Sequence, residues 1–170
     1  MEISAARRGH RFAVVRPSCI YGPGQHAHNA IPRFLRALIE GDAPMLFGRG
    51  ESVRDDVLAA DLSWLMVEAG LQKAEGAYHA AGECSRSVRE VAELCCEVAA
   101  EEGLETRTPT FDTTRAPKWW IDQHFDLGPS KALGYEPTPL REGLRAQLRW
   151  TRAGSDAAKT AEFVSPTRDL

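Results

Sequence analysis

The chain of 170 residues lacks several features that mark particular classes of protein. Its longest apolar runs are far too short to cross a bilayer, and Met1 and Glu2 precede no apolar segment of the signal-peptide kind. The net charge is only -3, with acids and bases interspersed, which argues against nucleic acid or an anionic membrane as a partner. We therefore expect a cytoplasmic protein that binds neither.

Cysteine and metal-ligand patterns are equally sparse. The sequence contains no Cys-x-x-Cys pair, and the adjacent Cys95 and Cys96 would point about a hundred degrees apart on a helix. Free thiols in a reducing compartment are therefore expected. His26 and His28 lie two residues apart with no third ligand beside them, so no metal site is predicted.

Two glycine and tyrosine patterns are also missing. No G-x-G-x-x-G or G-x-x-G-x-x-G occurs, and Tyr21, Tyr78 and Tyr135 are followed four residues later by Gln, Gly and Pro rather than by Lys. No internal repeat is present. The length suits one domain, and the hydrophobic content of 43% is enough for a real core.

What the sequence does contain is organised around residues 11–24. The apolar run from Phe12 to Val15 predicts a strand buried on both faces, as in a parallel sheet covered by helices. Pro17 is expected to end this strand, and residues 21–24 form a tight turn with two glycines. Open α/β sheets bind ligands where such strands end, although an ordinary strand exit would have the same pattern.

A second glycine-rich turn lies at residues 47–56, FGRGESVRDD. Glycine at positions 48 and 50 lets the backbone approach a ligand closely, and Arg54 offers a planar, permanently charged fork that suits a diphosphate. The alternative is that Arg54 pairs with Asp55, Asp56 or Glu51 in a surface network.

Both turns form part of a longer pattern. Residues 16–24 (RPSCIYGPG) are followed by Ile-Pro-Arg-Phe at 31–34, by Gly48-x-Gly50-x-x-x-Arg54-Asp55, and by the motifs at 76–82, 87–90 and 133–137. From about Arg11 to Trp150 this order and spacing resemble the extended short-chain dehydrogenase/reductase family. The resemblance is to its NAD(P)-dependent epimerase/dehydratase group, which acts mostly on nucleotide-sugars.

The resemblance implies a fold. The family begins with a glycine-rich dinucleotide-binding turn and carries Tyr-x-x-x-Lys on the helix before the strand that resembles residues 12–15. Met1–Arg8 is predicted as the end of such a helix. We therefore expect the carboxyl-terminal portion of a Rossmann-like α/β protein, with its remaining parallel strands and its small substrate-binding α/β subdomain, over residues 1–152. Residues 153–170 are expected to form a disordered tail.

Site residues follow from the same resemblance. Arg54 matches the arginine that binds the nucleotide-sugar pyrophosphate, and Pro17 and Ser18 match the segment that passes the nicotinamide, so they are the cofactor-binding candidates. Cys19 stands where the family often has an Asn that contacts the substrate, and Tyr21 is the remaining substrate-binding candidate. No catalytic residue is predicted. Asp56 and Ala59-Ala60 depart from the family, which usually has an aromatic and Val-Asp there.

Other elements are expected from periodicity and caps. Helices are predicted at 29–40 with Asn29 as cap, at 61–73 with Asp61 as cap, and at 87–103 with a Ser87/Glu90 capping box. Strands are predicted at 44–47, 76–81 and 106–111, with a short helix in 126–135 and an amphipathic helix at 140–152. In 112–125, aromatics alternate with bases, which could hold a nucleotide or simply pack under a loop.

Three functional readings follow. The chain is the substrate-binding half of an NAD(P)-dependent nucleotide-sugar epimerase or dehydratase, inactive alone because both catalytic motifs are absent. Alternatively, it is a non-catalytic nucleotide-sugar-binding or regulatory module. Thirdly, it is a remnant that self-associates or needs a partner chain to complete its sheet. The resemblance implies NAD or NADP as cofactor, although a chain without the glycine motif is not expected to bind it alone.

Overall fold

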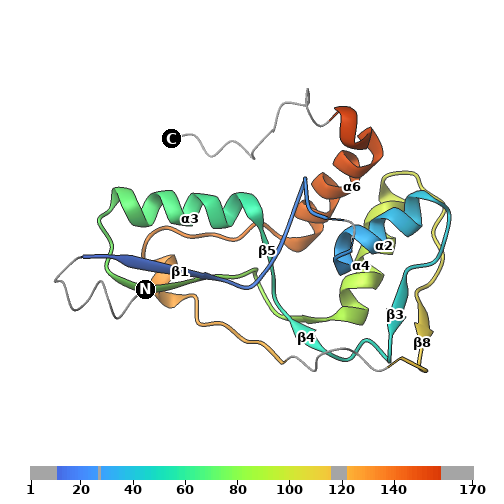
Figure 1. The fold of residues 1–170 in the computed structure, drawn as a ribbon, viewed down its shortest axis with the longest axis horizontal. Helices are drawn as coiled ribbons and strands as arrows, with labels where there is room; N and C mark the ends of the chain where they lie inside the picture. Colours follow the sequence, from blue (N-terminus) through green and yellow to red (C-terminus); the bar gives the residue numbers. More distant parts are fainter. Residues whose placement is uncertain (1–10, 27, 116–121, 158–170) are drawn as a thin grey trace.

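The computed structural model describes residues 11–26, 28–115 and 122–157 as an α/β arrangement of short strands and helices. Figure 1 shows α3 running alongside β1 at one end of the molecule and α2, α4 and α6 gathered at the other. In chain order the elements are β1 (Ala13–Pro17), β2 (Cys19–Tyr21), α2 (Ala30–Ile39), β3 (Met45–Phe47), β4 (Val53–Arg54), β5 (Asp56–Leu58), α3 (Ala59–Leu71), β6 (Gly76–Ala80), β7 (Arg86–Ser87), α4 (Val88–Glu101), β8 (Thr110–Asp112), α5 (Gly128–Lys131) and α6 (Leu140–Ala157).

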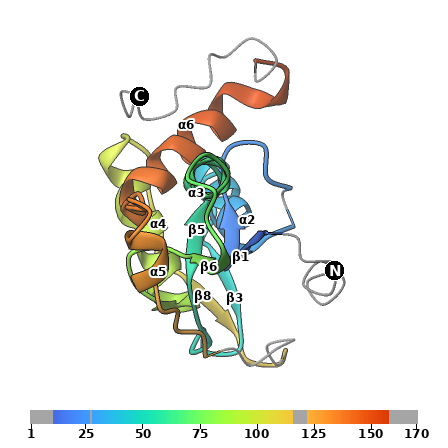
Figure 2. The same ribbon diagram turned by 90° about the vertical axis from the view of Figure 1, so that its left-hand side faces the viewer.

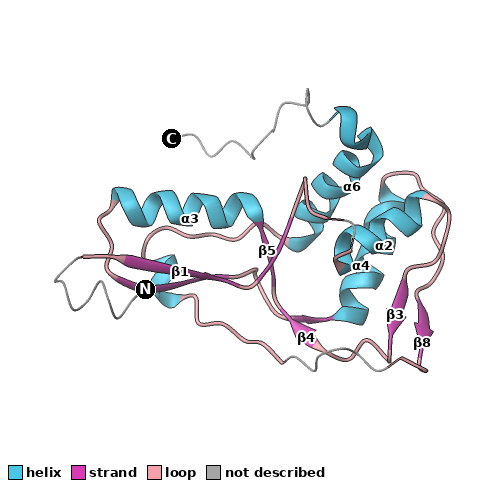
Figure 3. Cartoon of the chain, in the orientation of Figure 1, coloured by secondary structure: helices cyan, strands magenta, loops and turns pink. Residues whose placement is uncertain are grey.

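The strands pair two by two, and most pairs are parallel. β1 pairs with β6, β2 with β5 and β3 with β8, all in parallel, whereas β4 and β7 are antiparallel. The strands β4 and β5 run between the two helical regions (Figure 3). Parallel pairs need long crossover connections, which the helices between the strands supply.

The chain changes its strand partner at Ser18. The Ser18 amide still donates to Ala80 O of β6 at 2.8 Å, whereas the next amide, of Cys19, donates to Asp55 O at 3.1 Å beside β5. One continuous extended segment therefore joins two sheets. We call this change of partner at Ser18 and Cys19 the crossing of the strands. It brings the end of β1, the turn after β2 and the start of β5 close together.

The larger core lies where α2, α4 and α6 meet. Leu140, Leu144 and Leu148 of α6 are 4%, 0% and 0% exposed, as the predicted amphipathic pattern requires. An adjacent side of α6 carries arginines that pair with glutamates at the end of α4 and just after it, Arg149 with Glu102 for example at 2.8 Å. Figure 2, turned by 90°, shows α6 crossing above the end of α3.

A smaller core lies between α3, β5 and β6. Val57, Leu65, Ala80 and Tyr135 are its buried members. The Tyr135 hydroxyl donates to Ala81 O at 2.8 Å, so the buried ring also satisfies its polar end. This core packs α3 against β1, β5 and β6.

Local sequence signals predicted several elements correctly. The Ser87/Glu90 capping box forms in both directions at the start of α4. The strands expected at 44–47 and 76–81 appear as β3 and β6, and the chain leaves α2 through Gly41 with a φ of 81°. These signals depend on neighbouring residues alone, which explains why they could be read from the sequence.

Other expectations were wrong. The first strand continues through Pro17, which pairs with Ala80, and its residues are half-buried or exposed rather than buried on both faces. Proline is compatible with this position because it lies on the edge that faces away from β6. Asn29 precedes α2, but its side chain makes no cap hydrogen bond. The expected strand at 106–111 is the shorter β8, paired with β3.

Asp61 is not a helix cap. α3 begins two residues earlier, after Leu58, and the Asp61 carboxylate accepts hydrogen bonds from the Thr138 amide (2.7 Å) and hydroxyl (2.9 Å). Asp61 is 5% exposed, so these bonds satisfy a buried charge. They join α3 to the segment that leads into α6.

Some expectations lie partly or wholly outside the described residues. These are the helix end at Met1–Arg8, the Lys118-Trp119-Trp120 stretch, and residues 158–170 of the expected tail. α6 itself runs past Arg152 to Ala157, with non-helical dihedral angles at Gly154 (φ 77°, ψ 158°). In the part of the chain that the structure describes, no helix is long and apolar enough to cross a membrane.

We expect Asp61→Ala to lower the free energy of unfolding by about 2 kcal/mol, because two Thr138 donors lose a charged acceptor. Urea titration followed by circular dichroism measures the change. Asp42→Ala is the matched control, because Asp42 is exposed, and its effect should stay within about 0.5 kcal/mol. Equal losses in both variants would contradict the structural role of Asp61.

Candidate functional site

Asp55 holds the crossing of the strands together. Its buried carboxylate, 3% exposed, accepts a hydrogen bond from the Ser18 hydroxyl at 3.3 Å and another from the Gly82 amide. Gly82 has to be glycine, because a Cβ there would lie 2.6 Å from Asp56 O. Asp55 therefore has a structural role, and its neighbours on either side, Arg54 and Asp56, are left to face a cavity.

That cavity has a volume of about 240 Å³ and lies between the turn after β2, the start of α2 and the β4–β5 segment. Arg54 lines the same space as β2 (Cys19–Tyr21) and Gln25. The sequence placed these two regions thirty residues apart and predicted that they act together, and the fold does bring them to one cavity. The lining residues are Cys19, Ile20, Tyr21, Gln25, Asn29, Ala30, Ile31, Arg54 and Asp56.

Arg54 forms an ion pair inside this cavity. Its Nε donates to Asp56 Oδ2 at 3.3 Å, and the two side chains are 17% and 5% exposed. Burial raises the pKa of the Asp56 carboxyl, and the nearby Arg54 guanidinium opposes that rise. The pairing considered as the alternative for Arg54 therefore exists, but it lines a cavity rather than a flat surface.

A second guanidinium lies close to the first. Burial and repulsion from Arg54 lower the pKa of Arg33, whose Nη2 donates to Met45 O at 3.3 Å. The Arg33 guanidinium stacks over the Phe47 ring at 4.9 Å, and that of Arg115 lies 5.4 Å from the same ring. Arg33 therefore adds positive charge near Arg54, whereas Arg115 pairs with Asp112 at 3.5 Å.

Tyr21 is buried rather than available for chemistry. It is 2% exposed, and a Cβ at Gly143 of α6 would overlap its hydroxyl oxygen. Burial, reinforced by Asp61 and Asp56, raises its pKa, so the phenol stays neutral. Among the described residues its hydroxyl has no hydrogen-bond partner. Tyr21 lines the cavity as predicted and is poorly suited to act as an acid or base.

Cys19 is a neutral thiol at the cavity wall. Burial first, and then the negative charge of Asp56, raise its pKa. A neutral thiol is a weak donor and acceptor, so Cys19 contributes shape more than polarity. It is a free cysteine, in accordance with the expectation from the sequence.

The two cofactor-binding candidates lie apart from the cavity. Pro17 is exposed at the end of β1, and the Ser18 hydroxyl already binds Asp55. Neither residue lines the cavity, although both lie within two residues of Cys19. Cys19, Tyr21 and Arg54 therefore share the cavity, and Pro17 and Ser18 are not among its lining residues.

Three cavity residues escaped sequence reasoning. Gln25 donates from Nε2 to Ile20 O at 2.7 Å, while its buried Oε1 has no partner among the described residues. Asn29 was interpreted as a cap, and Asp56 as a departure from a family pattern. The position of Gln25 directly after a Gly-Pro-Gly turn was the one available signal. No group of three metal-ligating side chains occurs in residues 11–26, 28–115 and 122–157.

Comparison with known proteins identifies related enzymes. The model of the NAD dependent epimerase/dehydratase family matches residues 1–81. A dTDP-glucose 4,6-dehydratase of Actinoplanes sp. is 29% identical over 150 residues, which are 85% of this chain and 45% of that enzyme. A dTDP-4-dehydro-6-deoxy-D-allose reductase of Streptomyces sp. is 31% identical over 150 residues, 85% of this chain and 44% of that protein.

A solved structure shows the same fold. The UDP-glucose 4-epimerase of Thermotoga maritima, determined with UDP-glucose, superposes with a TM-score of 0.75 at 24% identity, over 89% of this chain and 49% of that chain. The fold is thus a Rossmann-like α/β fold. The chain belongs to the extended short-chain dehydrogenase/reductase family, in its NAD-dependent epimerase/dehydratase group. It spans about half the length of the curated relatives that it matches.

Proposed function

We propose that this chain is the substrate-binding half of a nucleotide-sugar epimerase or dehydratase and binds the diphosphate of a nucleoside-diphosphate sugar. The observation that supports this most directly is the cavity that Arg54 shares with the turn after β2. The relatives named above are a dTDP-sugar dehydratase and a dTDP-sugar reductase, and the solved structure holds UDP-glucose. A nucleoside diphosphate attached to a hexose is the chemistry that these proteins share.

Two kinds of positive group meet at the cavity. The Arg54 guanidinium provides a planar fork of donors that matches phosphate oxygens. The first turn of α2 provides backbone amides: Ala30 and Ile31 line the cavity, and the first amides of a helix have no acceptor within it. No acidic residue lies in this first turn, so the positive end of the helix is left for an anion.

The size of the cavity limits what it can hold. A volume of about 240 Å³ lies below the roughly 300–1,000 Å³ that is usual for drug-sized ligands. The cavity therefore accommodates the diphosphate and its immediate attachments, and the rest of the ligand extends outside it. Asp56 competes with the diphosphate for Arg54, because its carboxylate accepts from the Arg54 Nε and repels a second anion nearby.

In this proposal the chain binds the nucleotide-sugar but does not catalyse its conversion. When bound in such enzymes, a nicotinamide dinucleotide supplies hydride transfer, and a base has to take the proton of the sugar hydroxyl. Tyr21 and Cys19 both have raised pKa values and remain protonated, so neither takes that proton. The Ser18 hydroxyl in the predicted nicotinamide segment is bound to Asp55, and the sequence contains no glycine fingerprint for the dinucleotide.

Arg54→Gln should weaken binding of UDP-glucose or dTDP-glucose by about tenfold or more, because a charge-assisted pair of hydrogen bonds to the diphosphate is lost. Isothermal titration calorimetry with both sugars measures the effect. Arg49→Gln is the matched control, since Arg49 is an exposed arginine of the same turn. Equal weakening in the two variants would show that general charge, and not the cavity, attracts the ligand.

Affinity for UDP-glucose should rise as the pH falls from neutral into the acidic range, toward the raised pKa of Asp56. Protonation removes the competing carboxylate and frees Arg54, while the diphosphate diester keeps its charge in this range. Asp56→Asn should bind several-fold more tightly at neutral pH and lose the pH dependence. Calorimetry across this range checks both expectations, and a decrease of affinity in Asp56→Asn would contradict them.

The purified chain should not turn over nucleotide-sugars. Incubation with NAD⁺ or NADP⁺ and UDP-glucose or dTDP-glucose should produce neither reduced cofactor nor an altered sugar, as followed by absorbance and chromatography. The complete dTDP-glucose 4,6-dehydratase of Actinoplanes sp. serves as the positive control under the same conditions. Measurable conversion by this chain alone would refute the assignment as a recognition half.

A further inference from the structure

The glycine-rich turn at residues 48–52 rests on the start of α4. The Val88 amide, in the first turn of this helix, donates to Ser52 O at 3.0 Å. The next amide, of Arg89, donates to Gly50 O at 3.0 Å. The first amides of a helix have no acceptor within the helix, so the carbonyls of the turn satisfy them. The turn is therefore bound to α4 through its backbone.

The side chain of Arg89 provides a second hold on the same turn. Its Nε and Nη2 both donate to Arg49 O, at 3.2 Å and 2.9 Å. The carbon of the guanidinium lies 4.7 Å from the centre of the Phe111 ring of β8. A guanidinium that lies over an aromatic ring and donates twice to one oxygen has few other orientations. The charged end of this exposed residue is therefore fixed.

Gly50 shows how closely the turn approaches α4. A Cβ at this position would lie 2.6 Å from Cδ2 of Leu46 and 3.2 Å from both Cβ and the amide nitrogen of Arg89. The φ of Gly50 is 71°, in the left-handed region that favours glycine. The turn therefore has no room to move toward α4, and the hydrogen bonds from α4 oppose a movement away from it.

The turn continues directly into Arg54. β4, which contains Arg54, pairs antiparallel with β7, and α4 begins at the residue after β7. On the other side, the Gly48 amide donates to Asp112 O of β8 at 2.9 Å. The backbone before Arg54 is thus held between α4 and β8, and the Arg89 side chain contacts both the turn and β8.

We propose that Arg89 is a positioning residue: it fixes the backbone of the turn and so holds the Arg54 guanidinium where a diphosphate can bind it. Arg89 does not line the cavity, so it acts through the carbonyl of Arg49 and not by touching the ligand. Its role in binding rests on the proposed function above. Its hold on Arg54 requires no ligand, and the two parts are tested separately.

An exposed arginine could also help an anion site by its charge alone. Lysine separates the two effects, because Arg89→Lys keeps the charge but has no planar fork to donate twice and to lie over Phe111. If geometry matters, lysine restores only part of what methionine loses. If charge matters, lysine restores all of it.

The first experiment uses the full chain without ligand and compares it with Arg89→Met, which keeps a good helix former and an apolar contact. We expect the Gly48 amide to exchange with deuterium about fivefold faster, because the turn is held less firmly. NMR titration should give a higher pKa for Asp56, because a displaced Arg54 no longer opposes the rise that burial causes. Unchanged exchange and an unchanged pKa would overturn the proposal.

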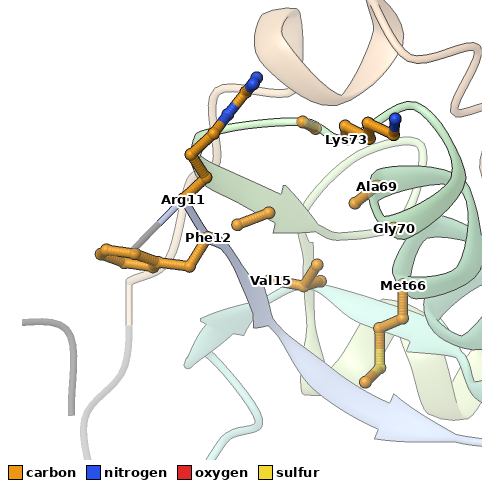
Figure 4. Close-up of a pocket in the computed structure, with 9 residues that line it drawn as sticks. Arg11, Phe12, Val15, Met66, Ala69, Gly70 and Lys73 are labelled. Carbon is orange, nitrogen blue, oxygen red and sulfur yellow. The ribbon is translucent and has the colours of Figure 1, made fainter. Parts of the chain in front are cut away.

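Calorimetry with UDP-glucose is the second experiment. Arg89→Met should weaken binding about fivefold, and Arg89→Lys should recover less than half of that loss. Arg11→Met is the matched control, since Arg11 is also an exposed arginine and pairs with Glu75. Figure 4 shows Arg11 at a hollow between β1 and α3 that shares no lining residue with the Arg54 cavity, so affinity should not change. Thermal melting establishes that the variants fold.

The outcomes separate the two proposals. Wild-type affinity in Arg89→Met or in Arg89→Lys would overturn the positioning role, and so would equal weakening by Arg11→Met. If the unaltered chain does not bind UDP-glucose, the proposed function fails. Amide exchange at Gly48 and the titration of Asp56 then still decide whether Arg89 holds Arg54 in place.

Discussion

The buried carboxylate of Asp55 is the constraint on which the rest of this structure depends. It accepts hydrogen bonds from the Ser18 hydroxyl and the Gly82 amide, while its backbone carbonyl accepts from the Cys19 amide. These bonds join β1, β5 and the end of β6 at the point where the first strand changes partner. Because Asp55 is held there, Arg54 and Asp56 on either side of it face the turn that follows β2.

The electrostatics of the cavity follow from that placement. Arg54, the first turn of α2 and the nearby Arg33 supply positive potential, and Asp56, the acidic residue among those that line the cavity, opposes it with a carboxylate whose pKa burial raises. Tyr21 and Cys19 are kept neutral by the same burial. Such a cavity suits an anion, because a guanidinium and the amino-terminal end of a helix both line it.

Sequence reasoning succeeded where neighbouring residues decide the outcome and failed where distant ones do. The capping box of Ser87 and Glu90 and the leucine face of α6 are local patterns, and both form. Asp61 also has the local pattern of a cap, but Thr138, far along the chain, takes its carboxylate instead. Pro17 likewise looks like a strand end, but its ring lies on the edge that faces away from β6, so the strand continues through it.

The sequence by itself determined the fold class, the family resemblance and the residue types at the candidate site, because turn glycines, caps and apolar periodicity act over a few residues. Only the tertiary structure decided that Arg54 pairs with Asp56, that Cys19 and Tyr21 share its cavity, and that Pro17 and Ser18 do not. It also decided which side of α3 stays exposed. These features depend on contacts between segments far apart in the chain. The burial that results also raises the pKa values of Cys19, Tyr21 and Asp56.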